Sequence, residues 1–211
     1  SVAATPPWSL WDGKDYKNMS DQDEAKFRMI EYHKWKFKAK IFSPLAPLTV
    51  KRTPVLMTRV EYGFLGSYNK YKKSPFETFY MGGDGMSGYS STYATETIGL
   101  RGYENGSIAG NGGYNSYGYA YSRLSMELRY PFLLEPSSTI YGLVFVEAGN
   151  AWRDLKDFNP FQLKRSAGVG VRIFLPMIGL MGIDWAYGFD RPDGYDQRGG
   201  SNFHFIIGQE F

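Results

Sequence analysis

Apolar and polar residues alternate along most of this chain, beginning near position 34. In 34–41, Trp35, Phe37 and Ile41 fall on one parity, whereas four lysines fall on the other. Successive side chains of a β-strand point to opposite faces of its sheet, so this period of two indicates a strand rather than a helix. The pattern predicts a strand with one apolar face and one cationic face.

The same alternation recurs in six later segments. Leu124 and Met126, for example, oppose Arg123 and Glu127. The six segments are 55–65, 119–130, 140–152, 166–174, 178–189 and 202–211. Together with 34–41 they predict an all-β protein with seven strands. We expect the four lysines to pair with Glu61 or its neighbours on the polar face rather than to attract free anions.

The connections between these strands alternate in length. Those after 130 and 174 are short, whereas 66–117, 153–165 and 190–201 are long and rich in Gly, Asp and Asn. Strands of about 9 to 13 residues with one apolar and one polar face, joined alternately by short and long loops, are typical of an outer-membrane β-barrel. A soluble antiparallel sandwich also shows this alternation, and the pattern alone leaves that alternative open.

Seven strands present a physical difficulty for a barrel. An open sheet edge in hydrocarbon leaves N–H and C=O groups unpaired, each at a cost of several kcal/mol, so the sheet must close. Single-chain bacterial barrels have an even number of strands. Ser1 is also not an initiator methionine. We therefore predict that 33–211 is the C-terminal portion of a larger antiparallel transmembrane β-barrel in outer-membrane lipid, whose N-terminal barrel strands precede Ser1.

The first 32 residues lack the alternation. Within 20–32, Ser20 is a candidate N-cap, Asp23 follows three residues later, and acidic residues occupy the first turn, which predicts one short helix. Because the long connections of a barrel are extracellular, 1–32 is assigned to an extracellular loop. The connection 66–117 is about 50 residues long, far beyond the usual 4 to 6 or so, and this length predicts a segment that is either functional or disordered.

Composition narrows the classes of function. The chain is 43% hydrophobic and 18% aromatic and has no cysteine. It is therefore too apolar for a disordered chain, and neither a disulfide framework nor a cysteine-ligated metal site is available. A net charge of +3 without a Lys/Arg-rich block gives no indication of nucleic-acid binding. No apolar run approaches the roughly 20 residues that a membrane helix requires.

The residue types of catalytic and metal sites form no recognisable pattern. His33 and His204 are too few for a histidine-based metal cluster, and His204 has the parity of the polar face. Residues 83–88 fit G-x-G-x-x-G, but no βαβ unit surrounds them. The aspartates of 190–196 lack the Gly and Glu spacing of an EF-hand loop. We expect no enzyme activity, no metal and no cofactor.

Two glycine-rich elements lie in the long connection. They are Phe79, Tyr80, Gly82 and Gly83 in FYMGG, and IGLRGYENG at 98–106. An FY-x-GG element followed by (V/I)RG(F/Y) resembles the sixth extracellular loop of the BamA family. These outer-membrane assembly factors share a 16-stranded barrel with TamA and the two-partner secretion transporters. Five strands follow the loop in the family, and five predicted strands follow it here.

The resemblance implies that Arg101, Gly102 and Tyr103 form the motif of this loop and that Arg101 folds into the barrel lumen. In the family this arginine pairs with acids on the next two strands, and the matching residues are Glu127 and Glu147. The residues agree with this reading, because glycines flank the arginine and a guanidinium fork can hold two carboxylates. An ordinary solvated loop arginine is the alternative.

This sequence departs from the family pattern at three points. Leu100 stands where Val or Ile is usual, Glu147 stands where Asp is commoner, and an extra stretch, DGMSGYSSTYATET, separates the two loop elements. The extra stretch leaves the detailed path of the loop open.

The last predicted strand ends in NFHFIIGQEF. Phe203, Phe205, Ile207 and Phe211 share one parity, and the final residue is aromatic. The resemblance implies that this strand forms a lateral gate, where strands of a substrate protein pair by β-augmentation. Gly208 would weaken the hydrogen-bonded ladder there, although a glycine in a strand also serves close packing.

The resemblance implies an assembly factor that folds and inserts β-barrel proteins into the outer membrane of Gram-negative bacteria. Its partners would be nascent outer-membrane proteins, accessory assembly lipoproteins and periplasmic POTRA domains of the same protein. A related secretion transporter of the TamA or two-partner type is the alternative, and the POTRA repeats upstream would discriminate between them. An outer-membrane hydrolase is a third hypothesis, which a serine-directed probe would exclude.

Overall fold

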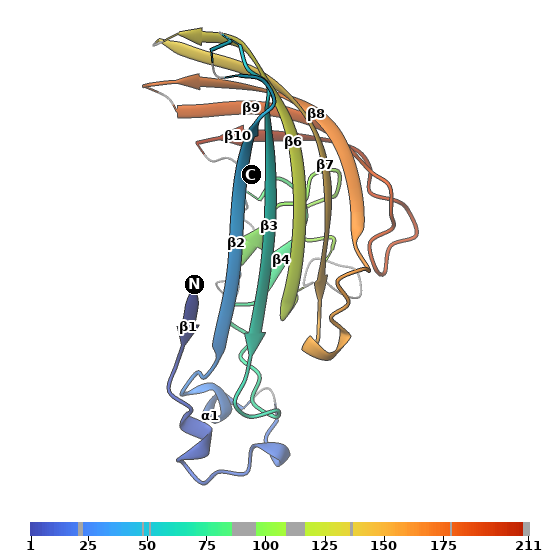
Figure 1. Ribbon diagram of the computed structural model, residues 1–211. Helices are drawn as coiled ribbons and strands as arrows, with labels where there is room; N and C mark the ends of the chain where they lie inside the picture. Colours follow the sequence, from blue (N-terminus) through green and yellow to red (C-terminus); the bar gives the residue numbers. More distant parts are fainter. Residues whose placement is uncertain are drawn as a thin grey trace.

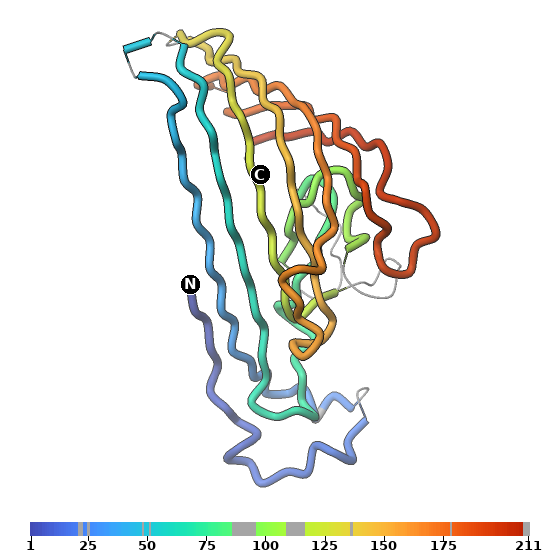
Figure 2. Tube along the Cα trace, turned by 45° about the vertical axis from the view of Figure 1, so that its right-hand side comes forward, coloured from blue at the N-terminus to red at the C-terminus, as the bar shows by residue number. Residues whose placement is uncertain are grey.

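The fold is a long, curved β-sheet with a loop packed on its concave side (Figure 1, Figure 2). The computed structural model describes residues 1–20, 23–47, 49–50, 52–85, 96–108, 117–135, 137–177 and 179–208. The strands lie side by side in chain order, so the curvature builds up steadily from the N-terminal to the C-terminal end of the sheet.

Eight strands build this sheet. Their bounds are β1 (Val2–Ala4), β2 (His33–Pro44), β3 (Val55–Gly66), β6 (Ala120–Glu135), β7 (Ser138–Trp152), β8 (Lys164–Leu175), β9 (Gly179–Gly188) and β10 (Gly200–Ile207). They pair in that order, and every pairing is antiparallel. The prediction of an all-β antiparallel fold is confirmed, and the seven predicted strands are β2, β3 and β6 to β10. β1 has three residues, too few for an alternation to reveal it.

The two faces of the sheet are the reverse of those in a soluble protein. On the convex face Phe37, Val146 and Phe203 are 58%, 53% and 65% exposed, whereas Arg59 and Glu147 on the concave face are 2% and 3% exposed. A continuous exposed apolar wall suits hydrocarbon rather than water. The strands form one curved sheet and not two stacked ones, so a sandwich is not the fold.

The sheet is open in the part of the chain that the structure describes. There β1 pairs with β2 alone, and β10 pairs with β9 alone. β6 and β7 extend beyond the predicted 119–130 and 140–152 as far as the pair Glu135 and Ser138, with a register shift between Pro131 and Leu133. Proline has no N–H for the ladder, which accounts for an irregularity at that point.

Short helical turns occupy the long connections. α1 covers Glu24–Phe27, so the helix within the predicted 20–32 segment has a single turn. The others are the 3-10 turns η1 (Trp8–Leu10), η2 (Tyr16–Asn18) and η3 (Leu155–Asp157). Among the described residues, no helix has the length and apolar character needed to cross a membrane.

The connection between β3 and β6 returns to the concave side of the sheet. It contains β4 (Phe79–Met81) and β5 (Glu96–Ile98), which pair in parallel. Figure 2 shows this segment, in green, inside the curve of the sheet. Its buried side chains pack on residues of β3, β6 and β7 in one cluster of Leu65, Phe79, Met81, Ile98, Leu100, Tyr103, Ile108, Tyr121 and Ala151. The loop is therefore held by a small core of its own.

Candidate functional site

The two glycine-rich elements of the loop pack directly against each other. The Gly82 N–H donates to the Ile98 carbonyl at 3.0 Å, and the Leu100 N–H donates to the Gly83 carbonyl at 3.1 Å. Gly82 and Gly83 have φ of 125° and 73°, and a Cβ on Gly82 would lie 2.3 Å from the Glu104 carbonyl oxygen. Only glycine accommodates both the backbone conformation and this close approach. The FYMGG element thus supports the backbone that carries Arg101.

The aromatic pair of the first element has two different contacts. Phe79 is fully buried and lies edge to face on Tyr121 of β6, with ring centroids 4.6 Å apart. Tyr80 donates from its hydroxyl to the Asn105 carbonyl at 3.2 Å, above Gly106, where a Cβ would strike the Tyr80 ring. One ring fixes the loop to the sheet, and the other fixes the two loop elements to each other.

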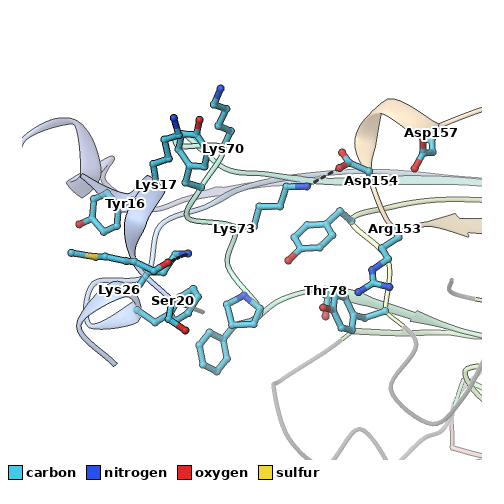
Figure 3. Close-up of a pocket in the computed structure, with 17 residues that line it drawn as sticks. Tyr16, Lys17, Ser20, Lys26, Lys70, Lys73, Thr78, Arg153, Asp154 and Asp157 are labelled. Carbon is cyan, nitrogen blue, oxygen red and sulfur yellow. Dashed lines mark hydrogen bonds and ion pairs between the residues drawn. The ribbon is translucent and has the colours of Figure 1, made fainter. Parts of the chain in front are cut away.

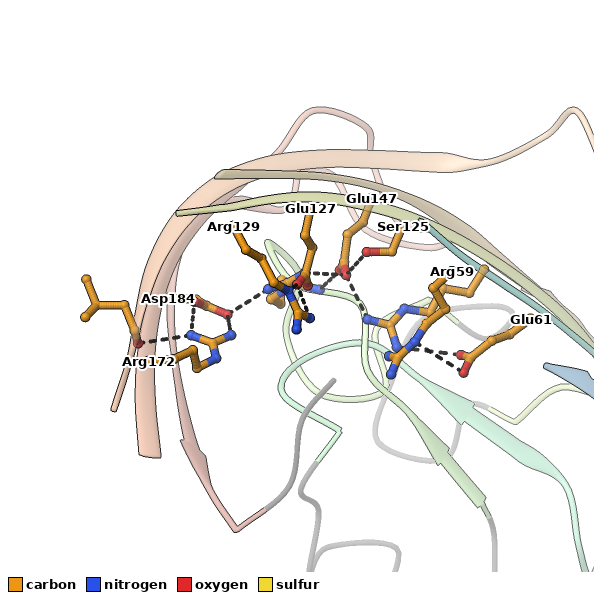
Figure 4. Close-up of polar contacts among 11 residues, drawn as sticks. Arg59, Glu61, Ser125, Glu127, Arg129, Glu147, Arg172 and Asp184 are labelled. Carbon is orange, nitrogen blue, oxygen red and sulfur yellow. Dashed lines mark hydrogen bonds and ion pairs between the residues drawn. The ribbon is translucent and has the colours of Figure 1, made fainter. Parts of the chain in front are cut away.

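Arg101 lies at the centre of a buried charge cluster on the concave face. Figure 4 shows the carboxylates of this cluster, on Glu127, Glu147 and Asp184. Its Nη2 donates to Glu127 Oε1 at 2.6 Å and to Glu147 Oε1 at 2.7 Å, and its backbone N–H donates to Glu147 Oε2 at 3.0 Å. The structure therefore brings together the arginine and both acids that sequence analysis selected. The side chain of Arg101 has no exposed surface, so it is not a solvated loop arginine.

A third acid, Asp184 of β9, completes what we call the Arg101 cluster, namely Arg101, Glu127, Glu147 and Asp184. Arg101 Nη1 donates to Asp184 Oδ2 at 2.9 Å, and Arg172 of β8 donates to both oxygens of Asp184 at 2.6 and 2.7 Å. Sequence analysis did not select Asp184. Its signal was present, because it is the single charged residue of the alternating strand 179–188.

Further cations balance the three carboxylates. Arg123 donates to Glu147 at 2.8 Å and Arg129 donates to Glu127 at 2.6 Å. The Arg101 guanidinium also lies 3.4 Å from the ring centroid of Phe145, a close cation–π contact. Burial alone would lower the pKa of Arg101, but the carboxylates of Glu147 and Glu127 hold this pKa above its usual value. The cluster is charged, paired and shielded from solvent.

Gly102 is held by the last strand. Its N–H donates to His204 Nε2 at 2.9 Å, and its carbonyl accepts from Asn202 Nδ2 at 3.1 Å. Gly102 has φ of 87°, and a Cβ there would lie 2.9 Å from the Gly188 nitrogen. Both side chains belong to β10, so one glycine connects the loop to the end of the sheet. The histidine acts as a hydrogen-bond acceptor here.

Two other glycines make room for this approach, and sequence analysis missed both. A Cβ on Gly188 would lie 2.3 Å from the Gly102 carbonyl oxygen, and a Cβ on Gly199 would lie 2.4 Å from the same atom. Nothing in the local sequence separates them from ordinary turn glycines. Their role depends on where the loop crosses β9 and β10, which the chain order alone does not give.

Tyr103 binds the loop motif to the start of the 189–199 connection. Its hydroxyl donates to the Arg165 carbonyl at 2.6 Å and accepts from the Asp190 N–H at 3.3 Å. Burial raises the pKa of Tyr103 to about 12. A hydrogen bond from the Arg165 guanidinium lowers the pKa of Asp190. The neutral phenol and the ionised carboxyl are thus both stable at neutral pH.

The residues of the predicted terminal strand lie apart from this cluster. Phe203, Phe205 and Ile207 are exposed on the convex face at 65%, 60% and 68%. Gly208 has φ of 76°, and its N–H still donates to the Leu180 carbonyl at 2.7 Å. Phe211 lies outside the described residues. The strand therefore presents apolar side chains outward and His204 inward.

Other residues considered from the sequence have ordinary partners. Lys38 pairs with Glu61 at 2.9 Å, and Lys34 and Lys36 both pair with Glu96 at 2.9 and 3.0 Å. His33 accepts from the Trp35 indole at 3.2 Å. Lys164 pairs with Asp193 at 2.8 Å. The G-x-G-x-x-G match at 83–88 extends outside the described residues.

A cavity of about 1120 Å³ opens at the rim where three long connections meet (Figure 3). It lies between the N-terminal segment, the start of the β3–β6 connection and the end of β7, and Lys73 crosses it to Asp154 at 2.8 Å. Lys17, Lys70 and Arg153 also line it. None of the predicted site residues lines the cavity.

Comparisons with known proteins concern the family and the fold. The family described as "Omp85 superfamily domain" matches residues 26–211. A crystal structure of BamA from Haemophilus ducreyi lacking POTRA domains 1–3 superposes with a TM-score of 0.57 and 20% sequence identity, over 83% of this chain and 34% of that one. No curated protein sequence matches. The present chain thus spans about a third of the length of that structure, and the likeness concerns the fold.

Proposed function

The chain belongs to the Omp85 superfamily, and on that premise we propose that it is part of an outer-membrane assembly factor that folds and inserts β-barrel proteins. In this proposal 33–211 contributes barrel strands, 66–117 is the loop inserted in the lumen, and 1–32 is extracellular. The protein acts without enzymatic chemistry, by holding and releasing polypeptide at the barrel wall.

The proposal rests mainly on the number of strands that the loop contacts through Arg101 and Gly102. Three carboxylates from β6, β7 and β9 converge on one loop arginine, and β10 holds the adjacent Gly102 from both sides. The loop therefore joins four strands through two consecutive residues. A buried ion pair that loses one partner costs several kcal/mol, so the loop fixes the relative positions of these strands while it is docked.

The convex face supports a location in the outer membrane. Its exposed aromatic and aliphatic rows match a lipid-facing band, and its polar concave face matches a wet lumen. Outer-membrane lipid is thus the proposed surroundings of the sheet. POTRA domains, further barrel strands and accessory lipoproteins would be partners of the whole protein, as in the assembly factors that the loop motif resembles.

The substrate in this proposal is a nascent outer-membrane protein. Within the described residues β10 hydrogen-bonds to β9 on one side only, so in the whole barrel its other edge would meet the first strand, and an opening between the two would admit an incoming strand. Extended segments add to exposed sheet edges through main-chain hydrogen bonds. Phe203, Phe205 and Ile207 would keep that edge in the apolar layer, and Gly102 would set its position from inside.

A reconstitution experiment tests the proposal. Proteoliposomes that contain the protein should accelerate the folding of a urea-denatured β-barrel substrate, measured by the gel shift of its folded form. Arg101→Glu places a fourth carboxylate beside Glu127 and Glu147, so we expect most of the acceleration to disappear and the loop to become sensitive to protease.

Arg191→Glu, in an exposed loop, is the matched control and should behave as the wild type. Full acceleration and unchanged loop protection in Arg101→Glu would contradict the proposal. If the wild type gives no acceleration but passes an unfolded passenger across the vesicle wall, the secretion transporter is the better assignment.

A further inference from the structure

The imidazole of His204 is the acceptor that holds the Gly102 N–H on β10. Its Nε2 lies 2.9 Å from the Gly102 nitrogen, and the residue is 6% exposed. Among the residues that the structure describes, this N–H is the one hydrogen-bond partner of the imidazole. A neutral imidazole has one accepting and one donating nitrogen, so Nε2 is unprotonated and the ring proton lies on Nδ1. The contact therefore requires one of the two charge states of histidine.

Protonation reverses the role of this nitrogen. Both nitrogens of an imidazolium are donors, so Nε2 would direct an N–H at the N–H of Gly102 instead of accepting from it. A buried N–H without an acceptor is unfavourable. The loop cannot relieve this contact by moving toward β9, because a Cβ on Gly188 would already lie 2.3 Å from the Gly102 carbonyl oxygen. The direction that remains for the loop is away from β10.

Charged groups of three elements act on the ring. Asp84 of the loop, Asp184 of β9 and Glu147 of β7 attract an imidazolium, whereas Arg101 of the loop repels it. Asp184 and Glu147 already accept from Arg101 at 2.9 and 2.7 Å. The three acids offset the cost of a second cation beside Arg101, but an imidazolium has no nitrogen left to accept from the loop backbone.

We propose that the contact between His204 and Gly102 is sensitive to pH, and that protonation of Nε2 releases the loop from β10 while Arg101 stays paired with the acids of β6, β7 and β9. The docked loop excludes from Nε2 a proton that the released histidine binds. Free imidazole takes up this proton near about pH 6.5, so the released state gains population as the pH falls below that value. The inference is independent of whether the protein inserts or secretes its substrate.

Amide hydrogen exchange of the whole protein in detergent, resolved by residue with NMR between about pH 5 and pH 8, tests the proposal. His204→Gln is the matched variant, because its amide oxygen is an acceptor throughout this range. The ratio of wild-type to variant protection at Gly102 removes the intrinsic pH dependence of exchange. We expect this ratio to be constant above about pH 7.5 and to fall at least about tenfold by pH 5, where binding of one proton to the released state alone permits about thirtyfold.

The Arg101 N–H is an internal control that needs no variant. It donates to Glu147 Oε2 at 3.0 Å and not to the histidine, so in the wild type only Gly102 should lose protection as the pH falls. A constant ratio of Gly102 to Arg101 protection in the wild type would overturn the proposal, whether both stay protected or both are lost together. The same pH dependence at Gly102 in folded His204→Gln would assign the effect to another group and would also overturn it.

Discussion

Arg101 and Arg59 lie on the same concave face with nearly the same burial, yet their surroundings differ completely. Arg101 reaches three carboxylates at 2.6, 2.7 and 2.9 Å, whereas Arg59, among the residues that the structure describes, has one carboxylate contact, at 3.7 Å. Burial is therefore not what distinguishes a completed charge site from an incomplete one. The difference lies in how many acceptors the sheet aims at each guanidinium.

The number of acceptors depends on whether the arginine belongs to a strand or to a loop. Arg59 belongs to a strand, so pairing fixes its row neighbours, which are Lys40 and Ser125 and include no acid. Arg101 belongs to a loop, so strand pairing does not fix its neighbours. It occupies the point where the curved sheet brings acids of β6, β7 and β9 together. This loop residue thus joins β6 and β7 to β9, although β8 lies between β7 and β9.

Removing the Arg101 guanidinium should have the largest effect. Arg101→Leu leaves Glu127, Glu147 and Asp184 with one cation fewer in a buried site, and we expect the free energy of unfolding to fall by about 3 kcal/mol. Unfolding by guanidinium chloride in detergent measures this free energy, and the protease sensitivity of the loop should rise in parallel. Arg59→Leu is the matched variant, with an expected loss below about 1 kcal/mol. Equal losses in the two variants would abolish the contrast between the sites.

A methyl group on Gly102 should have the next largest effect. Gly102→Ala imposes a left-handed backbone on alanine and drives its Cβ toward the Gly188 nitrogen, 2.9 Å away, so we expect a loss of about 2 kcal/mol. Gly13→Ala is the control, because Gly13 has φ of 66° but a Cβ at that position would meet no heavy atom within 4 Å. The control should lose only the backbone contribution, about 1 kcal/mol. If both variants lose the same amount, the loop does not press against β9.

The sequence predicted the wall of the molecule better than its interior connections. Alternation located the seven long strands because lipid and water impose opposite preferences on the two faces. The same parity placed Glu127 and Glu147 on the polar face. The alternation gave no information on β1, β4 or β5, since each of these strands has three residues, too few to show a period of two.

The missed part of the site depends on curvature. Asp184 was on the correct face, but its strand lies two positions beyond β7, and parity does not say that the sheet bends far enough for Arg101 to reach it. Gly188 and Gly199 became meaningful only once the loop was seen to cross them. His204 was assigned to the polar face, but its partner is a backbone N–H, which carries no side-chain signal.

Loss of the β10 contact to Gly102 should destabilise the protein less than either Arg101→Leu or Gly102→Ala. His204→Ala removes the acceptor of one buried N–H, and we expect a loss of about 1 kcal/mol together with faster hydrogen exchange at Gly102. His204→Gln, whose amide oxygen is also an acceptor, should restore part of the protection. Unchanged exchange at Gly102 in His204→Ala would show that β10 does not hold the loop, and the link between the loop and the sheet edge would fail.

The smallest effect is expected at Arg59 itself. Arg59→Gln removes a buried charge that lacks a short ion pair, and such replacements are close to neutral, so we expect the free energy of unfolding to change by less than about 0.5 kcal/mol. Arg101→Gln, measured in the same way, should show a large loss. A large loss in Arg59→Gln would instead mean that Arg59 is already paired within the protein, as Arg101 is.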